Sequence, residues 1–187
     1  MTTRKQIIKQ LAACLDSERF THSLNVEKIA IKLARKHHVS LKDASWAGLL
    51  HDYARQFSSE QLLLQARKHG LEIDKIRKFE PKLFHAELSA ILAKKYFGIK
   101  SKAILSAIRK HTTGSEKMSK LDKIVYLADH IEEYREFSGV GRLRSLAFKN
   151  LDQAISCSLD LMLKYLLEQG LPIYLDTIKT RNNFLLK

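Results

Sequence analysis

Glycine, proline and cysteine are all scarce in this sequence of 187 residues. It contains 7 Gly and 2 Pro, together well below the roughly 12% of average usage. A β-sheet protein with many tight turns would need more of both residues, so a largely helical domain is favoured. The length suits one domain of about 100–200 residues, and the 45% share of hydrophobic residues excludes a disordered chain.

The cysteines and the hydrophobic runs exclude several further classes. Cys14 and Cys157 lie far apart and form no Cys-x-x-Cys pair, so we expect free buried thiols and neither a disulfide framework nor a thiolate metal site. No apolar run approaches the roughly 18 residues of a membrane-spanning helix. The first residues also lack the apolar stretch of a signal peptide. We therefore expect a cytoplasmic protein that does not enter the membrane.

Acidic residues are outnumbered: 20 Asp and Glu face 33 Lys and Arg, which gives a formal net charge of +13. Such an excess suits a nucleic acid, an acidic membrane or a small polyanionic substrate. Residues 62–123 hold 15 Lys and Arg but only 6 Asp and Glu. These basic residues are scattered, with no run of five or more, so a solvated basic face is favoured over a nucleic-acid arm.

Apolar residues recur at helical spacing through most of the chain. Spacing and capping signals predict helices that begin near residues 18, 40 and 58, and helices over about 84–97, 101–110, 119–133, 151–169 and 176–184. Residues 71–82 contain Pro81 and are expected to form a connecting segment, and Gly139 and Gly141 are expected to break the chain. We predict a single compact all-α domain of about eight to ten helices.

Four of the eight histidines are expected to be structural. His37, His38 and His69 lie near predicted helix ends, where a cationic ring complements the negative end of the helix dipole. His130 adjoins an aspartate, but its side chain points about 100° away from it around a helix. None of the four is assigned to a site.

The remaining histidines, together with two aspartates, have the chemistry of metal ligands. The set is His22, His51, Asp52, His85, His111 and Asp129. Asp129 follows an apolar run, where an ionised carboxylate is costly to bury unless it is paired or bound to a metal. Imidazole and carboxylate together suit a divalent ion such as Fe, Mn or Zn. On spacing alone, a metal site and an incidental set of core residues are equally open.

The order of these residues resembles the H…HD…D signature of the HD-domain phosphohydrolases. The surrounding segments are more specific, and they resemble the YqeK-type branch of that family. They are residues 19–23 (RFTHS), 47–55 (AGLLHDYAR), 107–114 (AIRKHTTG) and 128–132 (ADHIE), with Met118, Arg135 and parts of residues 176–182. That branch comprises bacterial symmetrical bis(5'-nucleosyl)-tetraphosphatases, which cleave diadenosine tetraphosphate into two ADP. The resemblance runs from about residue 18 to 184.

The resemblance implies a single HD domain over residues 1–187, a helical bundle with its core at about 18–140. C-terminal helices at 150–187 would pack on this core and close the nucleotide site. It also implies that a divalent metal, most often Fe, with Mn, Zn, Co or Mg as alternatives, is held by His22, His51, Asp52 and Asp129. His85 and His111 match positions that complete a second metal site or contact phosphate. All six residues would be catalytic.

The resemblance further implies a set of nucleotide contacts around the metal ligands and in a late segment. The set comprises His22, Arg55, Gln56, Phe57, Ser58, His85, His111, Thr112, Asp129, Arg135, Pro172, Ile173, Tyr174, Leu175, Asp176 and Thr177. Arg135 has a structural alternative, because it could instead pair with Glu132 or Glu136 at the surface.

Aromatic residues near the His-Asp pair also have two readings. Trp46, Tyr53 and Phe57 could stack on adenine, although aromatics on a core helix more often pack. Two residues depart from the family pattern: Ala86 stands where Gly is frequent, and Glu133 stands where Pro is common. Both departures affect the expected loop geometry and neither removes a ligand.

Three functions are open at this point. The leading one is a metal-dependent hydrolase that cleaves diadenosine tetraphosphate symmetrically into two ADP, with His85, His111 and Arg135 stabilising charge on the phosphates. The second keeps the metal site but acts on another nucleotide or deoxynucleotide polyphosphate. The third is a basic nucleic-acid-binding protein with a vestigial metal site, although the expected Lys/Arg clusters with interleaved aromatics are absent. An apolar helix face could support a homodimer.

Overall fold

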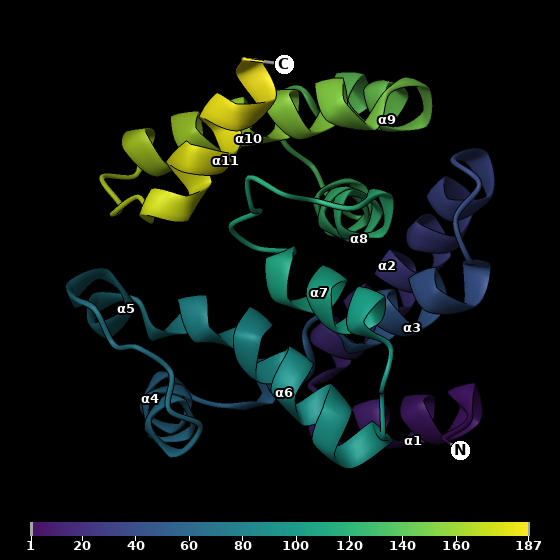
Figure 1. The fold of residues 1–187 in the computed structure, drawn as a ribbon, viewed down its shortest axis with the longest axis vertical. Coiled ribbons are helices and arrows are strands. Elements are labelled where there is room, and N and C mark those ends of the chain that lie inside the picture. The colour runs from purple at the N-terminus through teal and green to yellow at the C-terminus, as the bar shows by residue number, and fades with distance from the viewer. Residues whose placement is uncertain (1, 187) are drawn as a thin grey trace.

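The computed structural model describes residues 2–186, and that part of the chain contains helices and no strands (Figure 1). The α-helices are α1 (Arg4–Cys14), α2 (Ser17–Lys36), α3 (Leu41–Leu50), α4 (Ser59–Lys68), α5 (Lys75–Phe79), α6 (His85–Phe97), α7 (Lys102–Lys110), α8 (Lys120–Ile131), α9 (Val140–Lys149), α10 (Leu151–Glu168) and α11 (Leu175–Leu185). Two 3-10 helices, η1 (Tyr53–Gln56) and η2 (Pro81–Phe84), precede α4 and α6. The predicted all-α class is confirmed. None of the described helices is both long and apolar enough to span a bilayer.

Polar caps explain why most helices begin where the sequence predicts. The Ser40 side chain accepts a hydrogen bond from the backbone N–H of Asp43 at the start of α3. Ser58 and Gln61 form a reciprocal capping box at the start of α4. Gly98 takes the left-handed conformation, with φ 65°, that ends α6. Local sequence signals therefore set these boundaries.

Two segments expected to be irregular contain helices. Within residues 71–82, Asp74 caps the short helix α5 by accepting from the N–H of Arg77 at 2.8 Å. The break predicted at Gly139 is present, with φ 94°, but Gly141 lies inside α9. An exposed glycine costs a helix only about 1 kcal/mol, and burial of the apolar face of α9 offsets that cost.

The N-terminal helix α1 also forms where no helix is predicted. Thr3 and Gln6 form a capping box at its start, and Ile7 and Leu11 are fully buried. Together with α5 and α9, α1 brings the described residues to eleven α-helices, one more than the upper end of the predicted range.

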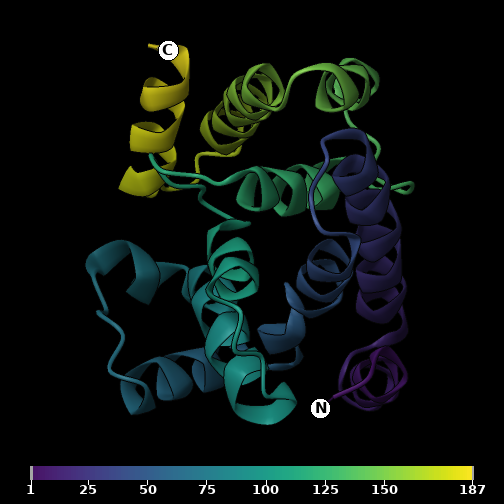
Figure 2. The ribbon, with the colours of Figure 1, turned by 45° about the vertical axis from the view of Figure 1, so that its right-hand side comes forward.

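Helix α8 lies at the centre of the molecule. It packs against α2, α3, α7 and α10, and Ile124, Val125, Tyr126, Leu127 and Ala128 are all fully buried. Helices α9, α10 and α11 form a layer on one side of α8, while α3, α6 and α7 lie on the other (Figures 1 and 2). The central position brings the C-terminal end of α8 close to the ends of α3 and α7.

The C-terminal helix α11 packs closely on the turn that follows α7. Gly114 in this turn has φ 71°, and a Cβ at that position would lie 2.7 Å from Cγ2 of Thr180. Only glycine fits such a close approach in the left-handed conformation. Elsewhere, Cys14 and Cys157 are free, as predicted, but half-buried where full burial was expected.

Candidate metal centre

Six side chains predicted to form a site meet at one place in the structure. They come from α2, from the end of α3, from the first residue of α6, from the end of α7 and from α8, and they are His22, His51, Asp52, His85, His111 and Asp129. Five of the six are buried, and Asp129 is half-buried. Helix termini hold three of the histidines, because a side chain at a terminus can leave the packed face of its helix and reach a shared centre.

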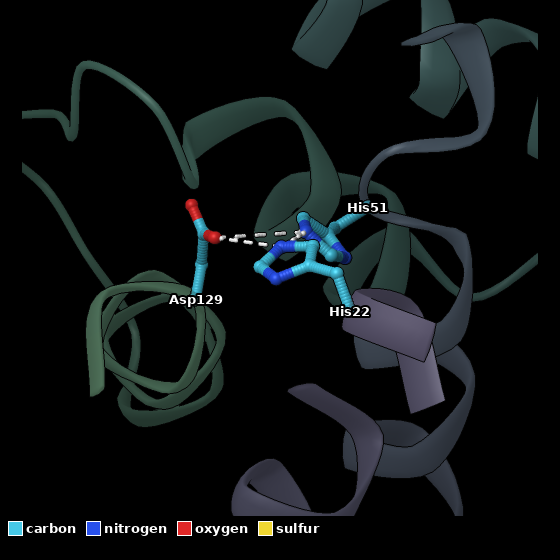
Figure 3. Close-up of side chains that lie close together, drawn as sticks. All are labelled: His22, His51 and Asp129. Atoms are coloured by element: carbon cyan, nitrogen blue, oxygen red, sulfur yellow. Dashed lines mark hydrogen bonds and ion pairs between the residues drawn. The ribbon is translucent and has the colours of Figure 1, made fainter. Parts of the chain in front are cut away.

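One group of potential ligands joins α2, α3 and α8. Nε2 of His22 lies 3.0 Å from Oδ1 of Asp129 and 3.3 Å from Nε2 of His51. Nε2 of His51 lies 3.9 Å from the same carboxylate oxygen. Figure 3 shows the two rings and the carboxylate directed toward one another. The arrangement offers two imidazole nitrogens and one carboxylate oxygen to a shared point.

A second group lies directly beside the first. Oδ1 of Asp52 lies 3.2 Å from Nε2 of His85 and 3.5 Å from Nε2 of His111. The two histidine Nε2 atoms are 2.9 Å apart. Nε2 of His51 lies 3.8 Å from Oδ2 of Asp52. His51 and Asp52 therefore stand between the two groups, and the six side chains form one continuous cluster.

Hydrogen bonds at the other ring nitrogen determine how the histidines face this centre. Nδ1 of His51 donates to the backbone carbonyl of Gly48 at 2.7 Å, and Nδ1 of His111 donates to that of Ile108 at 2.7 Å. Nδ1 of His85 likewise donates to a backbone carbonyl, that of Lys82. Since a carbonyl can only accept, each of these three rings carries its proton on Nδ1 and presents an Nε2 lone pair inward.

Inward lone pairs at such short range fit a bound cation. Two unprotonated nitrogens 2.9 Å apart, at His85 and His111, repel each other unless a positive charge lies between them. A hydrogen bond from Nδ1 to a carbonyl or carboxylate is the usual way in which proteins orient metal-ligating histidines. The donor set of imidazole nitrogen and carboxylate oxygen suits a divalent transition metal. The residues present therefore fit the metal that the sequence predicts.

The protonation states agree with this donor set. Burial lowers the pKa of His51 to about 4 and that of His85 to about 3. Burial alone would raise the pKa of Asp52, but His51, His85 and His111 around it hold the value well below the usual range. Metal ligation requires neutral imidazoles and ionised carboxylates, and these three groups are in those states at neutral pH.

His22 differs from the other buried histidines. Burial acts to lower its pKa, but the hydrogen bond and the charge of Asp129 outweigh burial and raise it. Burial acts to raise the pKa of Asp129, but the same contact, together with His51, His130 and Arg135, holds it well below the usual range. Asp129 therefore favours positive charge at His22, and a metal ion that binds there competes with a proton for Nε2 of His22.

Arginine side chains surround the carboxylates at the rim. Nη2 of Arg135 donates to Oδ1 of Asp129 at 2.8 Å, and its Nε lies 3.9 Å from Oε1 of Glu132. Arg135 therefore reaches the centre as predicted, and one of its two suggested surface partners, Glu132, is also a neighbour. Arg19 donates to Oδ2 of Asp52 at 3.4 Å.

Sequence reasoning does not single out Arg19 and Glu132 as members of the site. Oε1 of Glu132 lies 3.4 Å from Nδ1 of His22 and thus orients the fourth histidine. The available signal is positional: Arg19 stands three residues before His22, and Glu132 three after Asp129. Residues at this spacing share one face of a helix.

Part of the predicted nucleotide-contacting set lines a cleft beside the metal centre. The cleft has a volume of about 170 Å³, and its walls include Arg77, Lys110, Thr112, Gly114, Tyr174 and Asp176. Oγ1 of Thr112 lies 3.1 Å from Nε2 of His85 and 3.2 Å from Nε2 of His111. Thr112 thus joins the cleft to the metal centre.

The other residues of the late segment are not among those that line the cleft. Ile173 lines a separate groove between α10 and α11, Leu175 is exposed, Thr177 is buried and Pro172 is half-buried. Within residues 172–177, only Tyr174 and Asp176 belong to the cleft wall.

The segment after the His-Asp pair is divided in the same way. Nε of Arg55 lies 3.8 Å from Oδ2 of Asp52 and so reaches the centre. Gln56 donates to the backbone carbonyl of Tyr53 at 2.9 Å. Phe57 packs against the core, and the Ser58 hydroxyl caps α4. Arg55 is the member of this segment that the structure brings to the metal centre.

Histidines expected to be structural make structural contacts. Nε2 of His37 lies 2.7 Å from the backbone carbonyl of Ala147, which ties α2 to α9. The ring of His130 stacks on Tyr126, with centroids 4.5 Å apart. His69 is the C-terminal cap of α4, and His38 has a positive φ of 59° just after α2.

The aromatic residues near the His-Asp pair pack in the core. Tyr53 is buried and meets Phe97 edge-on, with ring centroids 5.0 Å apart. Trp46 and Phe57 are partly buried against the same core. At the two departures from the family pattern, Ala86 is a buried residue of α6 that lines the cleft, and Glu133 forms an exposed ion pair with Lys28 at 2.8 Å.

Curated relatives resemble this chain over almost its whole length. Residues 19–134 match the HD domain family. The symmetrical bis(5'-nucleosyl)-tetraphosphatase of Halalkalibacterium halodurans is 36% identical over 173 residues, which are 92% of each chain. The enzyme of the same name from Bacillus subtilis is 32% identical over 182 residues, which are 96% of each chain.

A solved structure agrees with these relatives. A predicted HD superfamily hydrolase from Clostridium acetobutylicum, described as involved in NAD metabolism, superimposes with a TM-score of 0.95 at 35% identity, covering 100% of this chain and 98% of that one. The family match, the relatives and the shared fold lead to one conclusion. This chain belongs to the HD domain family and, within it, to the group of the symmetrical bis(5'-nucleosyl)-tetraphosphatases.

Proposed function

We propose that this chain hydrolyses diadenosine tetraphosphate symmetrically into two ADP, with a divalent metal at the cluster of six residues. The observation that carries the proposal is the meeting of four inward-facing histidine Nε2 atoms with two carboxylates. The tetraphosphatase of H. halodurans, 36% identical over 92% of each chain, supports the choice of substrate.

His22, His51, Asp52 and Asp129 would hold the metal, and iron is the proposed ion, with Mn, Zn, Co or Mg as alternatives. Such an ion polarises a phosphate oxygen and lowers the pKa of bound water. His85 and His111 have Nδ1 committed to backbone carbonyls, so their Nε2 atoms present lone pairs. Lone pairs suit a second cation or a proton of the attacking water better than a phosphate oxygen.

Donors for the phosphate oxygens would come from other side chains. Arg135 is 40% exposed and Arg55 is 22% exposed, and each already touches a ligand carboxylate. Their remaining N–H groups can turn to phosphate oxygens without leaving the site. The Thr112 hydroxyl, between His85 and the cleft, is a third donor. Stabilising charge on both halves of the tetraphosphate in this way favours cleavage at its middle bond.

The nucleoside part of one half would occupy the cleft lined by Thr112, Tyr174 and Asp176. In this proposal residues 1–187 act as one domain, with a core at about 18–140 and residues 150–187 closing the nucleotide site. Exposed leucines such as Leu167 and Leu175 on the C-terminal helices are the proposed face for a homodimer. Nucleotide polyphosphates are cytoplasmic solutes, so the proposed place of action is the cytoplasm.

Product analysis tests the proposal directly. The protein is purified with its metal, incubated with diadenosine tetraphosphate, and the nucleotides are resolved by ion-exchange chromatography. We expect ADP as the sole product, whereas ATP plus AMP would contradict symmetrical cleavage. A higher kcat/KM for another nucleotide or deoxynucleotide polyphosphate would instead support the second function.

A pair of variants tests the ligand assignment. Asp52→Asn should lose bound metal and at least about a thousandfold in kcat. Asp43→Asn changes a half-buried carboxylate earlier in α3 and should keep both. An Asp52→Asn protein that retains metal and activity would remove Asp52 from the metal site.

A further inference from the structure

One arginine outside the metal centre joins two segments that are 97 residues apart in the sequence. Arg77 belongs to α5, and its side chain is only 14% exposed. Its Nη2 donates to the hydroxyl of Tyr174, immediately before α11. In Figures 1 and 2, α5 and the start of α11 lie on the same side of the molecule and face each other.

Several contacts hold the Arg77 guanidinium in this position. It lies 4.8 Å from the ring centroid of Tyr174 and 5.4 Å from that of Phe84. Nη1 donates to Oε2 of Glu87 at 3.0 Å, and Nε lies 3.5 Å from Oδ2 of Asp74. Two carboxylates therefore already balance its positive charge, so attraction of a phosphate is not its main role.

Tyr174 depends on Arg77 for its position. It is the N-cap residue of α11, yet its side chain makes no capping hydrogen bond. Its side chain accepts a hydrogen bond from Arg77, and its ring lies against the guanidinium of the same residue. The loop from Gly170 to Tyr174 is thus fastened to α5 through this contact, and we call the Arg77–Tyr174 pair the clasp.

The clasp forms part of the cleft wall. Arg77 and Tyr174 both line the 170 Å³ cleft, as does Thr112. Thr112, another residue of the cleft wall, has its hydroxyl 3.1 Å from Nε2 of His85, so the cleft adjoins the metal centre at Thr112. The clasp therefore lies where the part of a substrate farthest from the metal would bind.

We propose that Arg77 is a positioning residue that holds Tyr174 and its loop in place, so that the nucleoside part of the substrate meets a preformed surface. The inference rests on the proposed function and adds a determinant of substrate affinity to it. Without the clasp, the loop must become ordered during binding, and that entropy cost weakens affinity. The metal centre is unchanged, so the chemical step should proceed at nearly the same rate.

The chemistry of arginine suits this role better than that of lysine. A planar guanidinium can lie against two aromatic rings while donating hydrogen bonds from its edge, whereas the compact ammonium group of lysine cannot make all of these contacts at once. Arg77→Lys should therefore restore only part of what Arg77→Met loses. Tyr174→Phe keeps the ring and removes the hydroxyl, which isolates the hydrogen bond.

The experiment compares a ligand that has a nucleoside with one that lacks it. Binding of ADP and of inorganic tripolyphosphate to the metal-loaded protein is measured by calorimetry, alongside kcat and KM for diadenosine tetraphosphate. In Arg77→Met we expect ADP affinity to fall and KM to rise by about tenfold, with tripolyphosphate affinity and kcat within about twofold. Tyr174→Phe should lower ADP affinity by about threefold. The ADP affinity of Arg77→Lys should lie between those of the wild type and Arg77→Met.

A double variant and a matched control complete the test. Arg77→Met combined with Tyr174→Phe should match Arg77→Met alone, because the two residues act through one contact. Arg67→Met, at an exposed arginine of α4, should bind both ligands like the wild type.

Three results would overturn the proposal. They are unchanged ADP affinity in both single variants, equal loss for ADP and tripolyphosphate, and additive effects in the double variant. If Arg77→Met fails to fold, Tyr174→Phe decides, since it removes a single hydroxyl. The proposed function is judged separately: a wild-type protein that leaves diadenosine tetraphosphate intact refutes that function, while the ADP measurements still test the clasp.

Discussion

Glu132 shows how one residue outside the ligand set can control a ligand. Its carboxylate lies 3.4 Å from Nδ1 of His22 and also accepts from the backbone N–H of Tyr134 at 3.0 Å. Glu132→Gln keeps the shape but replaces the carboxylate that contacts Nδ1 of His22 with a neutral amide, which orients the ring less strongly. We expect metal affinity to fall by about 10–100-fold, measured by competition with a chelator. Glu133→Gln, at the exposed neighbour, is the control; equal affinities in the two variants would contradict this role.

Stability of the metal-free protein should depend on the buried histidines. His51 and His85 have pKa values of about 4 and about 3 in the folded chain, whereas an unfolded histidine has about 6.5. Between about pH 6.5 and 4 the unfolded chain therefore binds protons that the folded chain does not. The free energy of unfolding should therefore decrease as the pH is lowered through this range, by up to about 1.4 kcal/mol per pH unit for each histidine.

Other groups at the centre act in different pH ranges. The pKa of His22 is raised, so its contribution is complete below about pH 6.5 and is lost as the pH rises through its folded value. The lowered pKa values of Asp52 and Asp129 contribute stability above about pH 4 that is lost in stronger acid. Urea unfolding of chelator-treated protein at pH 7, 6 and 5 measures the histidine effect. A constant or rising free energy from pH 7 to 5 would contradict it.

At the residue scale, the candidate metal ligands can be predicted from the sequence, but the residues that orient or neighbour them cannot. Histidines and aspartates in the order of the HD family signature led to all six members of the cluster, whereas spacing alone left a metal site and an incidental set equally open. Arg19, Glu132 and Arg77 are residue types common on any helix surface. Their roles come from contacts with distant segments, such as the one between Arg77 and Tyr174.

Helices without strong local signals mark the limit of prediction at the element scale. The sequence signals at Gly141 and Pro81 favoured irregular chain, but α9 and η2 form there. At η2 the cause is local, because the Glu80 side chain accepts from the N–H of Lys82 and Pro81 stands at the first position of the helix. At α9 tertiary contacts decide. Arg144 of α9 donates to the backbone carbonyls of Ile131 at 3.1 Å, of Glu132 at 2.8 Å and of Arg135 at 2.9 Å. The missed helix thus supports the turn that carries two residues of the site.

A glycine pair tests how closely α11 must pack on the turn after α7. Gly114 and Gly98 have similar φ values, 71° and 65°, but a Cβ would be 2.7 Å from Thr180 at Gly114 and would meet nothing within 4 Å at Gly98. Gly98→Ala should cost about 1–2 kcal/mol for the left-handed conformation alone. Gly114→Ala should cost about 1–3 kcal/mol more because of overpacking.

Thermal and urea unfolding of both glycine variants measure this difference. A second alanine substitution at Thr180 should recover part of the loss in Gly114→Ala and none in Gly98→Ala, because only the first variant has the clash. Equal destabilisation of the two glycine variants would show that α11 can shift away from the turn at little cost.

Charge is distributed unevenly over the whole molecule. Residues 151–186, which include α10 and α11, carry four acidic and three basic residues, so the rest of the chain carries a net charge of +14. The metal centre itself is lined with carboxylates, which repel a tetraphosphate at short range. A positive field from the surrounding surface offsets that repulsion during approach. Composition alone does not identify the substrate, but a net positive charge is what favours capture of a polyanion.

Capture of the substrate should therefore depend on salt. Because the screening length shrinks from about 30 Å at 0.01 M to about 3 Å at 1 M salt, kcat/KM for diadenosine tetraphosphate should fall about fivefold between about 20 and 500 mM NaCl. The kcat value should change little, since charges in contact with the bound substrate are screened less. Lys94→Glu with Lys95→Glu, on the exposed last turn of α6, lowers the net charge from +13 to +9. This double variant should show lower kcat/KM at low salt and converge with the wild type at high salt, whereas parallel salt curves would place the relevant charges in the site itself.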